Sequence, residues 1–164
     1  MKVRLHLLLM ASVIAIAFPA LAGAAPVAAS GTWDDCNFAP VFRAAGPNLV
    51  GSVGITENFF GTLDGTYVGT ERDVVHADGS ANFHGSGVFT GNVAGRSGTA
   101  TYRYEGTAPA GQQASATWVL IGMTGSLASV KGHGTFVASF DGVSIACDAG
   151  IFSGSYEGAL NLGP

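Results

Sequence analysis

Glycine is so frequent in this chain that long helices are excluded from most of it. Of the 164 residues, 25 are glycine, and from about residue 30 onward one recurs every few positions. No segment there sustains the 3.6-residue apolar period of an amphipathic helix, whereas several alternate apolar and polar residues. Glycine weakens helix interiors and marks turns, bulges and close strand packing. The pattern predicts an all-β fold.

The alternating segments define eight expected strands. Short joints that contain Asp, Gly or Pro separate them, such as Asp78-Gly79 and Asp141-Gly142, and joints of this length connect neighbouring antiparallel strands. The expected strands span residues 30–38, 48–60, 65–76, 81–91, 97–106, 114–124, 132–140 and 149–160.

Each expected strand has one apolar face and one polar face. In 97–106 the apolar side carries Ala100, Tyr102 and Tyr104, with polar residues between them. Eight antiparallel strands with one buried face favour an up-and-down β-barrel, because closure removes the exposed sheet edges. Two packed sheets are the alternative. An outer-membrane barrel is disfavoured, because we find no lipid-facing band, no long external loop and no terminal aromatic residue.

The first 22 residues predict a secretory signal peptide. Residues 1–6 form a short basic start, residues 7–18 an apolar run, and residues 20–22 the small-x-small pattern that signal peptidase accepts,. The run is short for a membrane-spanning helix. We therefore expect cleavage after residue 22, a flexible leader over residues 23–29, and one soluble domain over residues 30–164, secreted or periplasmic, with no membrane partner after cleavage.

The charge balance disfavours nucleic acid as a partner. Once residues 1–22 are removed, five basic residues face eleven acidic ones, and the basic residues are scattered along the chain. No basic stripe is available to follow a phosphate backbone or an anionic membrane. The oligomeric state is left open, and a homo-oligomer is compatible with the sequence.

The two cysteines, Cys36 and Cys147, predict a disulfide. An exported chain meets an oxidising compartment, where a pair of thiols normally becomes a bridge. In the chain-entropy model, a link between positions this far apart is worth about 4–5 kcal/mol. The alternatives are a metal pair or a reactive thiol, which lack support because neither cysteine has a C-x-x-C spacing or an adjacent histidine. We expect the bridge to join the first strand to the last.

Glycine-containing motifs follow one another between about Ser30 and Phe140. They are Phe59-Phe60-Gly61-Thr62-Leu63-Asp64-Gly65, Asp78-Gly79 with Phe83-His84-Gly85, Phe89-Thr90-Gly91 with Gly95-Arg96-Ser97-Gly98, Ala116-Thr117-Trp118, and Gly125 with Gly132-His133-Gly134-Thr135-Phe136. This series resembles a bacterial domain-of-unknown-function family with an allene-oxide-cyclase-like, or dirigent-like, barrel.

The resemblance implies an eight-stranded antiparallel barrel, in agreement with the strand count. The wider superfamily includes plant dirigent proteins and bacterial cyclases, which hold an apolar molecule in the barrel and steer its closure. The close bacterial family implies no activity. Where its pattern commonly has a glutamate, this chain has Gly87, so any contribution of that acid is missing here.

Glu57 is the first candidate for chemistry. Its parity places it in a row with Val53, Ile55 and Phe59, on the face of its strand that we expect to be buried. A buried carboxyl group needs a partner or a raised pKa. Inside a barrel it would suit proton transfer, as a catalytic residue, or the anchoring of a ligand hydroxyl. A bulge at a preceding glycine would instead turn it towards solvent.

Tyr102, Tyr104 and Trp118 are the candidate ligand-binding residues. They fall on inward faces of adjacent expected strands, where aromatic rings with polar tips suit an apolar or aromatic ligand. The same residues would also serve as ordinary barrel core.

Two further groups carry weaker signals. Glu71, Arg72 and Asp73 must place charge on both faces of their strand, as an interior ion pair or as a solvated rim. Histidines 76, 84 and 133 show no metal-binding spacing,. We expect no metal site and no cofactor.

Three functions follow from these observations. The preferred one is a binding barrel for a small apolar or aromatic ligand. The second is a cyclase or isomerase in which Glu57 transfers a proton or stabilises charge, so the sequence does not decide whether the protein is an enzyme. The third is a secreted structural or interaction module whose barrel is filled by side chains.

Overall fold

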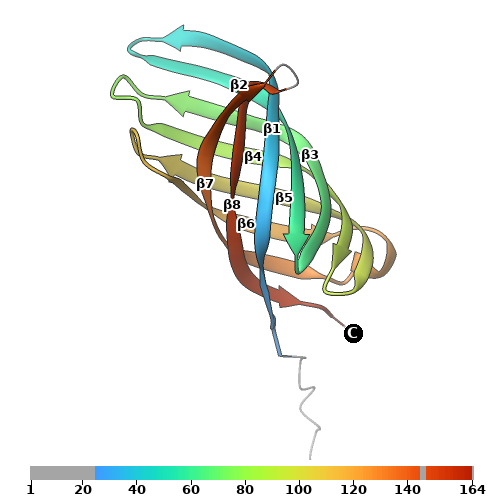
Figure 1. Ribbon diagram of the computed structural model, residues 1–164. Coiled ribbons are helices and arrows are strands. Elements are labelled where there is room, and N and C mark those ends of the chain that lie inside the picture. Colours follow the sequence, from blue (N-terminus) through green and yellow to red (C-terminus); the bar gives the residue numbers. More distant parts are fainter. Residues whose placement is uncertain (1–24, 145–146, 164) are drawn as a thin grey trace, which may run out of the picture.

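The computed structural model describes residues 25–144 and 147–163, which form eight strands closed into a barrel (Figure 1). The strands are β1 (Val27–Ala45), β2 (Asn48–Gly61), β3 (Leu63–Val75), β4 (Ala81–Val93), β5 (Arg96–Ala108), β6 (Ala114–Gly122), β7 (Lys131–Ser144) and β8 (Cys147–Asn161). Each pairs antiparallel with its neighbours in sequence, and β8 pairs with β1. The predicted up-and-down barrel is confirmed, and the two-sheet alternative is wrong.

One turn of 3-10 helix, η1 (Gly125–Leu127), connects β6 to β7. Within the described ranges, no helix has the length and apolarity to cross a lipid bilayer. The predicted signal peptide, residues 1–22, lies outside the described residues.

The largest departure from the expected strands is in β1. It begins at Val27, so residues 27–29, expected in a flexible leader, are strand, and Ala29 is buried. It also continues beyond residue 38, because its register with β2 shifts between Phe38 and Val41 and pairing then resumes. Ala39 in this bulge has a φ of 49°. The Ala39-Pro40 step, which by composition ends a strand, is here a bulge within one.

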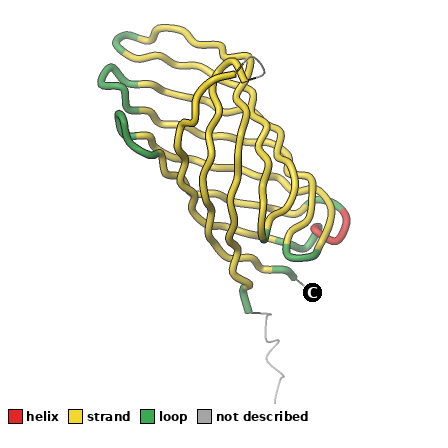
Figure 2. Tube along the Cα trace, in the orientation of Figure 1, coloured by secondary structure: helices red, strands yellow, loops and turns green. Residues whose placement is uncertain are grey.

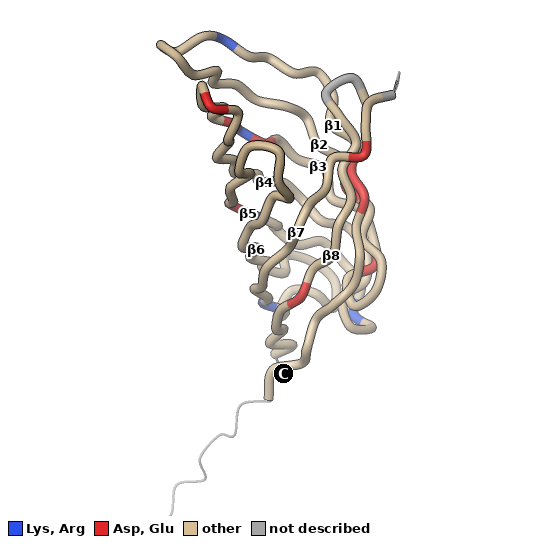
Figure 3. Tube along the Cα trace, turned by 60° about the vertical axis from the view of Figure 1, so that its left-hand side comes forward, with Lys and Arg blue, Asp and Glu red and all other residues tan. Residues whose placement is uncertain are grey.

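The two ends of the barrel differ in their connections (Figure 2). The turns β1–β2, β3–β4 and β5–β6 lie at one end, called the upper end below. The turns β2–β3 and β4–β5 lie with η1 at the opposite, lower end. Charged residues are sparse along the described strands, and no continuous basic stripe runs over them (Figure 3).

Large aromatic rings lie across glycines on the inner face of the barrel. A Cβ atom at Gly85 would overlap the ring of Tyr104, and one at Gly158 would overlap Trp118. Trp118 also covers Gly134 on the intervening strand. The recurrent glycine of the sequence therefore provides space for aromatic side chains in a narrow barrel.

The cysteine pair forms the predicted bridge. The Sγ atoms of Cys36 and Cys147 are 2.05 Å apart, and their Cα atoms are 5.1 Å apart. The bond joins β1 to the first residue of β8, as expected. A disulfide is compatible with an oxidising compartment outside the cytoplasm.

Candidate functional site

The barrel interior is filled in its lower half and open in its upper half. The open part is a cavity of about 420 Å³. Two cross-strand alanine pairs face it, Ala81 with Ala108 and Ala114 with Ala138. Because these inward positions carry only a methyl group, the side chains there do not meet across the barrel.

Four aromatic rings stand in the wall of the cavity. Trp33 on β1 and Tyr104 on β5 both pack edge-on against Phe136 on β7, with ring centroids 5.3 and 5.5 Å apart respectively. Phe83 on β4 contacts Tyr104 at 6.2 Å. All four rings line the cavity, and they offer a flat apolar ligand several surfaces to stack on.

The cavity wall formed by β1, β2 and β3 carries four carboxyl groups. Asp35 on β1 lies directly opposite Glu57 on β2. Glu71 and Asp73 follow two residues apart on the inner face of β3 and share a hydrogen bond. All four line the cavity. Arg72 between them is exposed, so the charge run forms neither the interior ion pair nor the solvated rim that the sequence suggested.

Burial shifts the titration of this group. It raises the pKa of Asp35 to about 7, against the effect of the Phe152 backbone N–H, which donates to Oδ1 at 3.0 Å. The pKa of Glu57 is raised well above its usual range by burial and then by the charges of Asp35 and Glu71. Carboxyl groups that are this hard to ionise keep protons at pH values where exposed ones have lost them.

Glu71 and Asp73 behave as a pair. Burial is the main cause that raises the pKa of Glu71 well above its usual range, followed by the charge of Asp73, while a hydrogen bond with the Tyr104 hydroxyl opposes the rise. The pKa of Asp73 is also raised by burial, although the hydrogen bond with Glu71 lowers it. Their shared hydrogen bond raises the pKa of Glu71 and lowers that of Asp73. A proton held between the two carboxyl groups accounts for these opposite effects.

Three buried polar atoms near these carboxyl groups have no hydrogen-bond partner among the described residues. They are Nε1 of Trp33, Oδ1 of Asn37 and the hydroxyl oxygen of Tyr67. The exposed fractions of these side chains are 5%, 6% and 0%. Trp33 and Asn37 line the cavity, and Tyr67 lies opposite Glu57 on the next strand. Unpaired buried polar groups are costly, so these atoms single out this part of the barrel as the candidate site.

Glu57 and Tyr104 lie where the sequence placed them. Glu57 faces the interior and is only 4% exposed, so the bulge that would have turned it to solvent does not occur. Tyr104 is part of the cavity wall. Whether either residue binds or reacts with a ligand stays a prediction.

Tyr102 and Trp118 lie in the filled half and do not line the cavity. They stack on each other with centroids 6.0 Å apart and planes inclined by 25°. The Trp118 indole N–H donates to the backbone oxygens of Thr135 and Glu157, both at 3.2 Å. Parity gave their face correctly but not their depth along the barrel axis.

The sequence reasoning missed the contribution of β1. Trp33, Asp35 and Asn37 alternate on its inner face, and all three line the cavity. The alternation over residues 33–37 carried this signal, but the polar members masked it, because an inward-facing row is expected to be apolar.

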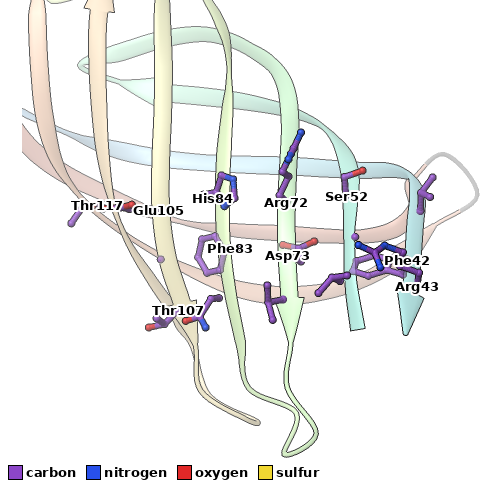
Figure 4. Close-up of a pocket in the computed structure, with 16 residues that line it drawn as sticks. Phe42, Arg43, Ser52, Arg72, Asp73, Phe83, His84, Glu105, Thr107 and Thr117 are labelled. Carbon is purple, nitrogen blue, oxygen red and sulfur yellow. The ribbon is translucent and has the colours of Figure 1, made fainter. Parts of the chain in front are cut away.

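A broader hollow of about 920 Å³ crosses the upper parts of β1 to β6 (Figure 4). Ser52, Arg72, His84, Glu105 and Thr117 form one continuous cross-strand row along it. The last four are exposed, and two of them, Arg72 and Glu105, carry charges of opposite sign. None of the buried, unpartnered polar atoms of the described chain lies in its lining. The interior cavity is therefore the better candidate site.

Within the described ranges, no group of three or more His, Cys, Asp or Glu side chains is arranged to hold a metal ion.

Comparisons with known proteins place the chain in a family. No curated protein sequence matches it. A solved structure of a DUF3224-family protein of unknown function from Shewanella oneidensis MR-1 is similar, with a TM-score of 0.63 and 18% identity over 85% of this chain and 99% of that one. At this identity the likeness shows the fold alone. Neither comparison names the allene-oxide-cyclase-like superfamily, so that label stays a prediction.

The family model described as "Protein of unknown function (DUF3224)" matches residues 32–146. The matched range contains the four cavity carboxyl groups and the unpartnered atoms of Trp33, Asn37 and Tyr67. It covers most of the barrel, from β1 to the end of β7. This chain belongs to the DUF3224 family.

Proposed function

We propose that the protein is an exported barrel that binds one small molecule with an apolar, aromatic body in its upper cavity. The observation that carries the proposal is the combination of a cavity of about 420 Å³ with buried, unpartnered polar atoms in its wall. Ligand pockets typically enclose about 300–1,000 Å³ and combine apolar walls with a few polar groups that fix orientation.

The shape of the cavity supports an aromatic body. Four aromatic rings from β1, β4, β5 and β7 stand in its wall, and the alanine pairs on β4–β5 and β6–β7 leave the space between the strands open. The lower half shows what the same barrel does when large residues occupy the inward positions, since its aromatic rings pack against one another and fill it. The filled-barrel alternative therefore lacks support in the upper half.

Export is supported by two independent features. Residues 1–22 have the pattern of a signal peptide,. The Cys36–Cys147 bridge is a bond that persists in oxidising compartments and is rare in the cytosol,.

The proposal is tested by native mass spectrometry of the protein purified gently from the exported fraction of its own host, followed by denaturation. We expect a bound small molecule that is released when the barrel unfolds. Ala138→Phe, which places a ring in the cavity, should remove this cargo. Ala128→Phe is the matched control, because Ala128 is exposed at the lower end. A cargo that stays bound to the Ala138→Phe variant would contradict binding in the cavity.

A second function, isomerisation or cyclisation of the bound molecule, is favoured by one observation. Glu57 is a desolvated carboxyl group beside a second one, Asp35, whose pKa lies near neutrality. Glu57 could give a proton to a bound molecule while a neighbouring carboxylate takes one up, a net isomerisation that needs no co-reactant. Incubating the released cargo with fresh protein would show conversion, and Glu57→Gln should abolish this conversion even at cargo concentrations that saturate the variant.

A further inference from the structure

We infer that the upper cavity selects a cationic ligand, an amine carried on an aromatic body, with the ammonium group placed among Asp35, Glu57, Glu71 and Asn37 and the aromatic body against Trp33 and Tyr104. This inference rests on the proposed ligand-binding function and names the ligand class.

Charge complementarity is the first argument. Asp35, Glu57, Glu71 and Asp73 all line the cavity, and its described lining contains no Lys, Arg or His. No side chain in that lining can therefore neutralise an ionised carboxylate. A single ammonium group would supply the missing charge at the point where the three strands β1 to β3 bring the acids together, and buried charges are tolerated when paired.

The unpartnered acceptor is the second argument, and it is independent of charge. Asn37 Oδ1 is buried, lines the cavity and accepts no hydrogen bond. It stands two residues from Asp35 on the inner face of β1, so one group could contact both. An ammonium group has three N–H donors and no acceptor, so it can donate to an amide oxygen and to two carboxylates at the same time.

The aromatic wall is the third argument. Trp33 continues the same inner row of β1, and Tyr104, on the facing wall, hydrogen-bonds Glu71. Indole and phenol rings attract cations through their faces. Aromatic rings beside carboxylates are thus suited to an aryl-alkyl amine, whereas an aromatic acid would bring a fifth carboxyl group into the cluster.

Proton linkage follows from the groups that face Asp35. Glu57 from β2, Glu71 and Asp73 from β3 and the Tyr104 hydroxyl from β5 line the same cavity, and Asp34 and Asp141 add further negative charge. The Tyr67 hydroxyl from β3 lies near Glu57 and Glu71. His84 acts only on Asp73. Binding a cation favours the ionised acids, so the cavity releases protons when an amine enters. Affinity for the amine should rise with pH through about 7, where Asp35 titrates.

The test is isothermal titration calorimetry of the mature, disulfide-bonded protein with three ligands of one shape: 2-phenylethylamine, 2-phenylethanol and 3-phenylpropionate. At pH 8 we expect the amine to bind at least tenfold more tightly than the alcohol, and the carboxylate not to bind. At pH 5.5 the preference for the amine should shrink at least threefold. Titrations in two buffers of different ionisation enthalpy should show net proton release for the amine and none for the alcohol.

Variants locate the effect. Asp35→Asn and, separately, Glu71→Gln should reduce the preference for the amine at least fivefold. Asp34→Asn is the matched control, because Asp34 is the neighbouring residue, accepts a hydrogen bond from Asn58 at 2.8 Å and points to the outer face. It should change the preference less than twofold, because Asp34 acts on the cavity only through its charge from the outer face. Circular dichroism confirms that each variant is folded.

The outcomes separate the two proposals. If the alcohol binds as tightly as the amine, or if the carboxylate binds most tightly, the inference of a cationic ligand is overturned while the proposed ligand binding stands. If no ligand of the series binds and the native protein releases no cargo, both fail. An amine preference that Asp34→Asn removes and Asp35→Asn keeps would also overturn the inference.

Discussion

The two halves of the barrel interior are built from the same eight strands and differ only in what stands at the inward positions. In the lower half, large aromatic rings such as Trp118 lie over glycines and fill the interior. The Trp118 indole N–H and the Tyr156 hydroxyl there are paired, and the Tyr156 hydroxyl accepts from the Leu63 N–H at 2.8 Å. In the upper half, alanines leave a cavity, and carboxyl groups stand in its wall. One half is a hydrophobic core, whereas the other gives up core packing for a polar site.

The candidate site lowers the stability of the fold, and the core raises it. Desolvated carboxyl groups and unpartnered polar atoms both oppose folding. A closed barrel can accommodate them because the strands are held by continuous backbone pairing and by the filled half below. Binding of a ligand that pairs these groups should therefore stabilise the fold.

The largest effect is expected from the core. Trp118→Ala removes a fully buried indole that covers glycines on β7 and β8, and it leaves the oxygens of Thr135 and Glu157 without their donor. We expect a loss of about 3–5 kcal/mol in the free energy of unfolding, measured by urea denaturation. Val119→Ala on the exposed outer face should change it by less than about 0.5 kcal/mol. Equal losses in both variants would contradict the division into halves.

The disulfide joins β1 to β8 beside the open half, so its removal tests whether the two halves unfold separately. Replacing Cys36 and Cys147 by serine should lower the free energy of unfolding by about 2–5 kcal/mol. Hydrogen exchange should then rise mainly in the upper parts of β1, β7 and β8, while the amides around Trp118 keep their protection. Uniform loss of protection over the barrel would show that the halves unfold as one unit.

The acids of the upper half should make the stability of the fold depend on pH. The pKa of Asp35 is about 7 in the fold and near 3.9 in an unfolded chain. The folded state thus binds the proton more tightly, and stability is highest below about pH 4 with respect to this group and falls as pH rises towards 7. The difference amounts to on the order of 4 kcal/mol. The raised pKa values of Glu57 and Glu71 act in the same direction.

Asp35→Asn isolates this contribution. The asparagine keeps an acceptor for the Phe152 N–H but does not titrate, so the variant should be about 2–4 kcal/mol more stable than the parent at pH 8 and nearly equal to it at pH 4. Chemical denaturation at both pH values measures this. Asp34→Asn on the outer face is the control and should show no such dependence. A variant less stable than the parent at pH 8 would mean that the charge of Asp35 is compensated in the fold.

Much of the fold could be predicted from the sequence, because alternation and turn residues are local signals. The eight strands and the closure followed from them, and the bridge followed from two cysteines in a chain expected to be exported. The path of β1 through Ala39 and Pro40 did not, because a bulge depends on whether pairing with β2 resumes beyond it. That information lies in the partner strand rather than in the residues of the bulge.

The candidate site was predicted only in part, for a related reason. Parity placed Glu57 and Tyr104 on the inner face, where they line the cavity. It placed Tyr102 and Trp118 on the same face, but their height along the axis depends on the stagger of neighbouring strands, which no single strand encodes. Asp35 and Glu57 become neighbours through the β1–β2 register, so the grouping of the acids also required the paired strands.

The smallest expected effect tests whether the alanines keep the upper half open at the expense of packing. Ala114→Val and Ala138→Val each add two methyl groups to one cross-strand pair at the cavity, and both positions lie in strands, where valine is favoured. We expect each to raise the free energy of unfolding by about 0.5–1 kcal/mol, because filling empty space adds contacts without displacing core. The same variants should weaken ligand binding, since the added methyl groups occupy the ligand's space.

Ala28→Val, exposed on β1, controls for strand preference alone. A gain in stability with full retention of binding would show that these alanines are not what keeps the site open, and the carboxyl groups, which resist collapse of the wall on one another, would then be the better explanation of the cavity.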